Sequence, residues 1–237
     1  MGNMNVHSPR ETFDRAQQKL LDHVLILGSM VKQAVQEAME ALQRRDHASA
    51  RRIYEADQRI NEKRYSIEYD CVTMIATQQP MARDVRFLTA ILEIITELER
   101  IGDYAKGISK INLLLDEQPI EQSVFINLVL MADLGLDMLS RSLDAFINND
   151  AQAARQITLE DTRVDQLYNQ IYRILLDQMT TWSTSIDRGN HLMWAAHNLE
   201  RLADRVTNIC ERIVYVVTGE MKELDAPNGI QEGSLHE

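Results

Sequence analysis

The chain has 237 residues, 45% of them hydrophobic and 26% charged, which excludes a disordered protein and leaves room for one domain or two small ones. Acidic residues outnumber basic ones, 36 to 25, and the net charge of −11 excludes a generic binder of the nucleic-acid backbone, which depends on clustered Lys and Arg. Aromatic residues are only 5%, which argues against a stacking platform for single-stranded nucleic acid.

Helix is predicted nearly throughout, because the chain contains only nine Gly and four Pro and its apolar residues recur every three or four positions. Asp46 is a predicted N-cap, and Pro80 is a predicted helix stop. The six predicted helices span residues 11–45, 47–79, 81–115, 120–148, 151–182 and 187–218. The polar ends, residues 1–9 and 225–237, are predicted to be disordered tails.

The two cysteines, Cys71 and Cys210, lie far apart in apolar helical contexts. No disulfide framework is indicated, so a reducing cytoplasm is the expected location. The N-terminal segment lacks the apolar core of a signal peptide. The most apolar stretch, residues 124–132, is too short to span a bilayer and contains Asn127.

The second half of the chain repeats the first. Seven residues between positions 41 and 59 recur 104 positions later, as Asp57 recurs at Asp161. After the helix stop at Pro80, the distance between matching positions becomes 101 residues, as between Glu99 and Glu200. The predicted fold is therefore all-α, with two tandem antiparallel three-helix bundles, six helices in all, related by internal duplication. The first bundle is predicted to span residues 11–116 and the second residues 120–219.

An acidic motif anchors each half: Leu-Glu-Arg, two small or apolar residues, then Asp, at residues 98–103 and 199–204. Four-residue spacing puts the Glu and the Asp on one helix face, about 5–6 Å apart at Cβ. If the second and third helices pair around Pro80, positions whose numbers sum to 160 lie level. Each bundle then gathers four oxygen-bearing side chains: Asp57, Asn61, Glu99 and Asp103, and in the second half Asp161, Asp165, Glu200 and Asp204.

Three or four carboxylates without a nearby lysine repel one another, and a hard cation removes that cost. We therefore interpret each set as a metal site whose oxygen ligands suit Mg, Mn, Ca or Fe better than structural zinc. Asn61 carries no charge, so the first site is expected to be the weaker. The competing interpretation is a solvated acidic surface paired with arginines. His197 lies three residues before Glu200 but corresponds to Thr96, and is interpreted as a core or partly exposed histidine.

Other chemistry is not indicated, because the sequence lacks the Gly-rich, GxSxG, HExxH and CxxC motifs of common catalytic and cofactor sites. A non-enzymatic protein is therefore expected. A polar, basic corner at residues 78–86, which contains Arg83 and Arg86, is compatible with docking a partner or an anion, although such a feature is more often only a turn.

The two acidic motifs, the upstream Asp-x-x-x-Asn/Asp elements and the Gln-Gln-Pro-x-Ala-Arg-Asp-Val-Arg turn together resemble the PhoU family over about residues 13–218. This resemblance implies a cytoplasmic, often dimeric regulator of phosphate transport and phosphate signalling, which represses the starvation response when phosphate is plentiful. It implies contact with a sensor histidine kinase and the ATPase of the phosphate ABC transporter, and membrane association only through these partners. It also implies Fe, Zn, Mg or Mn clusters at the acidic sets.

Two alternatives stay open on sequence grounds. One is a ferritin-like, carboxylate-bridged iron bundle, which would need Glu-x-x-His ligands that this sequence lacks. The other is a helical adaptor without metal, whose acidic faces are only solvated.

Overall fold

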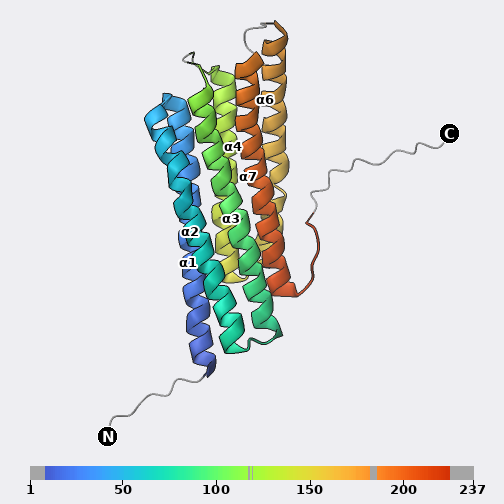
Figure 1. Ribbon diagram of the computed structural model, residues 1–237. Coiled ribbons are helices and arrows are strands. Elements are labelled where there is room, and N and C mark those ends of the chain that lie inside the picture. The colour runs from blue at the N-terminus through green and yellow to red at the C-terminus, as the bar shows by residue number, and fades with distance from the viewer. Residues whose placement is uncertain (1–8, 117, 119, 182–185, 225–237) are drawn as a thin grey trace, which may run out of the picture.

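The computed structural model describes residues 9–116, 118, 120–181 and 186–224, and every regular element within them is an α-helix (Figure 1). The helices are α1 (Pro9–Arg44), α2 (His47–Gln78), α3 (Ala82–Leu114), α4 (Gln122–Asn148), α5 (Ala151–Thr158), α6 (Asp161–Thr181) and α7 (Ile186–Thr218). The all-α prediction is confirmed. The predicted tails lie outside the described residues, except for Pro9, with which α1 begins. Residues 183–185, which lie between the predicted fifth and sixth helices, are also outside the described residues.

Aspartates cap the second helix of each half, as the sequence predicts for Asp46. The Asp46 carboxylate accepts a hydrogen bond from the Ser49 N–H at 3.0 Å. In the second half Asp150 accepts bonds from the N–H groups of Gln152 and Ala153, at 3.0 and 2.9 Å. These bonds satisfy N–H groups that the first helical turn leaves without a partner.

The prediction of one continuous helix over residues 151–182 is wrong. α5 ends at Thr158, and the backbone N–H groups of Leu159 and Glu160 bond to carbonyls three residues back rather than four. This is the tighter 3₁₀ pattern, which interrupts an α-helix locally. The Thr158 hydroxyl also donates to the Arg155 carbonyl at 3.0 Å.

A contact with α4 holds the interruption in place. The Arg141 guanidinium of α4 donates two hydrogen bonds to the Glu160 carboxylate, at 2.8 and 2.6 Å. The equivalent part of the first half lies inside α2, which runs without a break. The break matters for the candidate site, because it places Asp161 in the first turn of α6.

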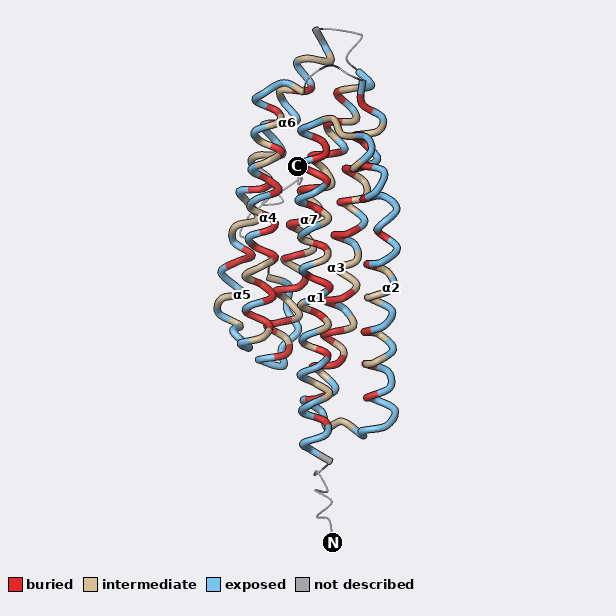
Figure 2. Tube along the Cα trace, turned by 90° about the vertical axis from the view of Figure 1, so that its left-hand side faces the viewer, coloured by how far each residue is buried: buried red, intermediate tan, exposed pale blue. Residues whose placement is uncertain are grey.

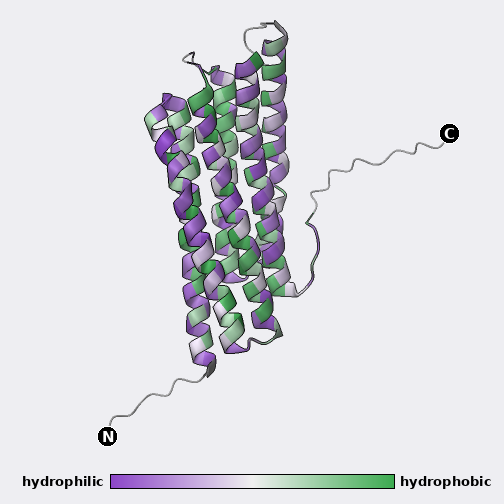
Figure 3. Ribbon diagram, in the orientation of Figure 1, coloured by the Kyte–Doolittle hydropathy of each residue, from purple (hydrophilic) through white to green (hydrophobic). Residues whose placement is uncertain are grey.

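The two bundles lie side by side, and α3 and α7 form the seam between them (Figure 1). α3 and α7 run antiparallel, since Glu93 pairs with Arg212 at 2.8 Å while Glu97, four residues later, meets Asn208 at 3.3 Å. Buried residues line the inner faces of the helices (Figure 2). Residues of high hydropathy lie mainly where the helices face one another, and hydrophilic residues predominate along the outer side of α2 (Figure 3).

Among the described helices, α4 alone has the length and the apolar composition that a membrane span would need. Its residues Val124, Leu128 and Met131 are fully buried in the core of the bundle, where α4 packs against α1, α5, α6 and α7. A helix in the core of a bundle is apolar on the faces that it buries, while Ile126 and Leu130 of α4 are 48% and 42% exposed.

Candidate metal centre

The second acidic set lies where the start of α6 packs against the middle of α7. Burial, followed by the charge of Asp165, raises the pKa of Asp161 to about 7. Burial, followed by the charges of Asp204 and Asp165, raises the pKa of Glu200 to about 7. The pKa values of Asp165 and Asp204 are also raised, mainly by burial. The four predicted residues lie on neighbouring parts of α6 and α7, near enough for their charges to act on one another.

Two oxygens of this cluster are buried and accept no hydrogen bond from the described residues: Asp161 Oδ1 and Glu200 Oε2. The Glu200 oxygen lies 3.2 Å from His197 Nδ1, but the two groups are not oriented as a hydrogen bond. Arg201 Nε is 3.9 Å from Asp204 Oδ2, a loose contact. Arg201 and Arg205 offset part of the charge of Asp204, and the all-oxygen donor set of the cluster fits a hard cation.

The first acidic set is arranged differently. Asp57 is only 5% exposed, and its Oδ2 accepts a hydrogen bond from the Lys106 ammonium at 2.7 Å, while its buried Oδ1 accepts none from the described residues. The Asn61 amide donates to the same oxygen at 3.2 Å. The expectation that no lysine lies nearby is wrong: Lys106 stands three residues beyond Asp103 on α3, and that spacing places it on the same face.

The other two carboxylates of the first set share this neighbourhood. The pKa of Glu99 is raised by burial and then by the charge of Asp103, and that of Asp103 by burial and then by the charge of Asp57.

The predicted pairing of α2 with α3 is offset by about two residues. Gly102 packs against Ile60, where a Cβ would lie 3.0 Å from Ile60 Cδ1, whereas the predicted register places it level with residue 58.

Across the described ranges, no three side chains of Asp, Glu, His or Cys stand in an arrangement that could hold a metal ion. Both sets therefore require side-chain rearrangement before they could ligate one, and the metal assignment stays a prediction. His197 is 39% exposed, and its ring centre lies 5.9 Å from that of Trp194, which matches its interpretation as a partly exposed histidine.

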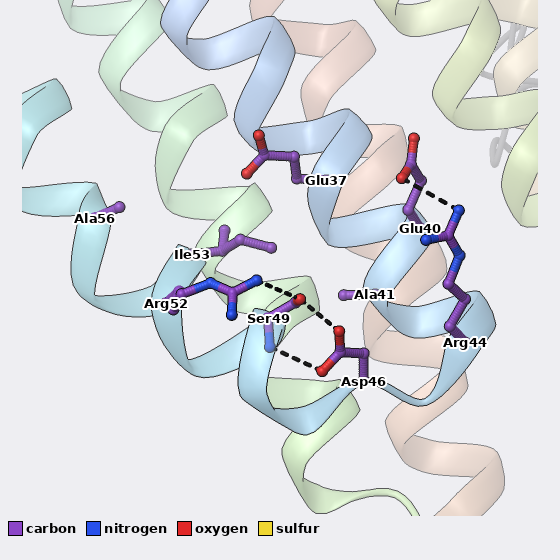
Figure 4. A pocket seen from close by; sticks show the side chains of 9 residues that line it. All are labelled: Glu37, Glu40, Ala41, Arg44, Asp46, Ser49, Arg52, Ile53 and Ala56. Carbon is purple, nitrogen blue, oxygen red and sulfur yellow. Dashed lines mark hydrogen bonds and ion pairs between the residues drawn. The ribbon is translucent and has the colours of Figure 1, made fainter.

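A hollow of about 420 Å³ lies between α1 and α2, and none of the eight candidate ligands lines it (Figure 4). Its polar side chains bond to one another. The Ser49 hydroxyl donates to Asp46 at 2.5 Å, and Arg52 donates to Ser49 at 2.7 Å. Arg44 lies 3.8 Å from Glu40, one turn earlier on α1. These bonds belong to the α1–α2 connection and its helix cap, so we assign no ligand to this hollow.

The basic corner between α2 and α3 is a structured turn. The Asp84 carboxylate accepts a hydrogen bond from the Met81 N–H at 3.3 Å and another from Arg10 at 2.8 Å. Arg83 is exposed, while Arg86 is half-buried. The contacts explain the local backbone and assign no ligand to the two arginines.

The comparison with known protein families matches each half of the chain separately. Residues 24–111 and 128–213 each match the PhoU domain. The "Phosphate-specific transport system accessory protein PhoU homolog" of Streptococcus pneumoniae serotype 4 is 36% identical over 219 residues, covering 91% of this chain and all of that protein. The "Phosphate-specific transport system accessory protein PhoU" of Escherichia coli K12 is 35% identical over 218 residues, covering 92% of this chain and 90% of that protein.

Two solved structures share the fold. The crystal structure of the phosphate transport system regulatory protein PhoU from Streptococcus pneumoniae has a TM-score of 0.83 at 34% identity, covering 89% of this chain and 99% of that one. The crystal structure of PhoU from Pseudomonas aeruginosa has a TM-score of 0.82 at 30% identity, covering 88% of this chain and all of that one.

Proposed function

Because this chain belongs to the PhoU family, we propose that it is an accessory protein that regulates phosphate transport and phosphate signalling. The observation that carries this proposal is the match of both halves to the PhoU domain, together with relatives of this name that align over nine-tenths of the chain. The protein acts without catalysis and represses the phosphate-starvation response when phosphate is plentiful.

The proposed setting is the cytoplasm, where the protein forms a homodimer. It contacts a sensor histidine kinase and the ATPase of a phosphate ABC transporter, and meets the membrane only through them. The family resemblance supports these partners, and the names of the relatives support the link to a phosphate transport system.

The proposed activity includes binding of Fe, Zn, Mg or Mn by Asp161, Asp165, Glu200 and Asp204. Two observations support this: the four carboxylates share one cluster, and two buried oxygens in it accept no hydrogen bond from the described residues. When bound, the ion supplies the positive charge that the cluster lacks. Asp161 and Asp165 would hold it from α6, and Glu200 and Asp204 from α7, so that the two helices share one ligand set.

Deletion of the gene tests the regulatory role. In phosphate-rich medium, the deletion strain is expected to show raised phosphate-starvation gene expression or phosphate uptake, and a wild-type copy should restore both. Unchanged expression and uptake in the deletion strain would contradict the proposed function.

Metal binding is tested separately on purified protein prepared without chelator or affinity-tag metal. Elemental analysis should find bound metal in the wild type and little in Glu200→Gln/Asp204→Asn. The matched control is Asp133→Asn/Asp144→Asn, which removes the same number of carboxylates from exposed positions on α4. Equal metal content in the three proteins would show that the ligands are assigned wrongly.

A helical adaptor without metal is the second candidate. It is favoured by the fact that no group of Asp, Glu, His or Cys in the described part of the chain is already arranged to hold an ion. The adaptor predicts no bound metal and no change in thermal stability on adding Mn²⁺ or Fe²⁺. The ferritin-like alternative is not supported, because the sequence contains no Glu-x-x-His element.

A further inference from the structure

We propose that Lys106 takes the place of a metal cation in the first acidic set, so that this chain binds metal through its second bundle alone. The inference rests on the proposed metal binding by the second set. It concerns the residues in which the two halves differ, and it assigns the first set a structural rather than a metal-binding role.

Asp57 already has a cationic partner on one of its oxygens. Its side chain is 5% exposed, and its Oδ2 accepts bonds from Lys106 at 2.7 Å and from Asn61 at 3.2 Å, while its Oδ1 is buried and accepts no hydrogen bond from the described residues. An ammonium group has three donors and no acceptor, so Lys106 cannot ligate a cation while it is protonated. A metal ion at Oδ2 would have to displace the bonded ammonium, and an ion at Oδ1 would lie on the same carboxylate as the Lys106 ammonium and be repelled by its charge.

The second half of the chain carries different residues at the positions that correspond to Lys106 and Asn61. Lys106 corresponds to Thr207 and Asn61 to Asp165, at the same offsets that align the shared carboxylates. The first set thus holds three carboxylates and one ammonium, a formal charge of −2, whereas the second holds four carboxylates, a formal charge of −4. Both differences lower the negative charge of the first set. Thr207 supplies no charge and donates its hydroxyl to the Asp204 carbonyl at 2.7 Å.

A third difference supports the placement of Lys106. Its ammonium lies 5.3 Å from the centre of the Tyr54 ring, a cation–π contact that helps to hold it over Asp57. Tyr54 corresponds to Thr158, the residue at which α5 ends. The half that contains the lysine therefore keeps a continuous α2, and the half that lacks it has a break directly before Asp161.

Bound metal in a set of folded variants tests this inference. The probe is Mn²⁺ alone, or Fe²⁺ without oxygen, measured per chain by equilibrium dialysis and elemental analysis, with circular dichroism to confirm folding. In the wild-type background, Glu200→Gln/Asp204→Asn should remove the bound metal, and Glu99→Gln/Asp103→Asn should leave it unchanged. These two pairs are matched, because they neutralise equivalent residues of the two halves.

Exchanging the differing residues tests the cause. Asn61→Asp/Lys106→Thr should add metal binding to the first bundle, roughly doubling the metal per chain, and Asp165→Asn/Thr207→Lys should abolish binding in the second. Equal loss of metal from both matched pairs would overturn the inference and leave the proposed metal binding intact. Absence of metal from the wild type and from Asn61→Asp/Lys106→Thr would overturn both. Because the matched pairs do not depend on the exchange, the inference stays testable if an exchanged variant misfolds.

Discussion

Asp161 and Glu200 are carboxyl groups that burial and neighbouring charges hold protonated to unusually high pH, with pKa values of about 7. In an unfolded chain such groups have pKa values near 4. A raised pKa means that the folded state binds more protons than the unfolded state between about pH 4 and pH 7. The contribution of these two groups to the stability of the metal-free protein therefore falls as pH rises through that window.

Asp161→Asn should remove part of this effect, because the amide keeps the shape of the side chain and loses its charge. In chelator at pH 8 we expect the variant to be more stable by at least about 1 kcal/mol, or about 2–4 °C in Tm, and its Tm to vary less between pH 5 and pH 8. Differential scanning calorimetry measures both. The control is Asp133→Asn, at an exposed position on α4. An Asp161→Asn profile that parallels the wild type would contradict the assignment.

Lys106→Met should destabilise the protein, because it leaves the buried Asp57 without its cation. A fully buried ion pair broken in this way costs about 3–5 kcal/mol, and since the Lys106 side chain is 32% exposed we expect about 2–3 kcal/mol. Adding Asp57→Asn to the same chain should recover part of the loss. Urea denaturation of both single variants and the double variant measures the coupling. A Lys106→Met variant as stable as the wild type would show that the pair is solvated.

At the scale of the element, the turn between α5 and α6 depends on a contact from α4. Arg141→Ala should release Glu160, which accepts two hydrogen bonds from it, and so loosen the segment directly before Asp161. We expect faster amide hydrogen exchange over residues 158–164 and a loss of about 1–2 kcal/mol. Asp137→Ala is the matched control, since it removes the exposed partner of the same arginine and leaves Glu160 bonded. Equal exchange in both variants would show that the contact does not hold the turn.

The elements that local patterns determine were predictable from sequence. The caps at Asp46 and Asp150 and the helix stop at Pro80 are local signals, and they placed the helix ends within a few residues. The break after Thr158 was not predictable in this way, because Arg141 and Glu160 are 19 residues apart and on different helices. The close match of the two halves also favoured one long helix.

The candidate sets were predictable as groups and not in their details. Periodicity and duplication brought the right carboxylates together, but simple counting from Pro80 misses the two-residue offset that packing of Gly102 against Ile60 imposes. Lys106 was visible in the sequence, three residues beyond Asp103, opposite a threonine in the other half. Only the side-chain geometry shows that its ammonium bonds to Asp57.

At the scale of the whole molecule, the polar seam between α3 and α7 joins the bundles. Arg205 lies 3.3 Å from Glu97 and donates to the Tyr104 hydroxyl at 3.2 Å, and the side chains of Arg205 and Glu97 are 16% and 17% exposed. Arg205→Ala should therefore cost about 2–3 kcal/mol, with faster exchange along both helices. Arg212→Ala is the control, because its partner Glu93 is 51% exposed and such a pair contributes about 0–1 kcal/mol. Thermal unfolding of both variants measures the loss of stability in each. Equal losses would show that the seam is held by apolar packing alone.

α1 begins and α7 ends at the same end of the molecule as the basic corner (Figure 1). Arg10 bonds to Asp84 of the corner, and a Cβ at Gly219 would lie 3.6 Å from the Arg86 guanidinium. A purification tag or fluorescent reporter attached before α1 would therefore leave the helices beside Asp84 of the corner, whereas the chain after α7 turns back along that helix, where the Leu224 N–H donates to Glu211 at 3.0 Å. Immobilised through the start of α1, the protein would present its opposite end to solution, so a capture assay for a ligand of the corner needs an attachment point elsewhere on the molecule.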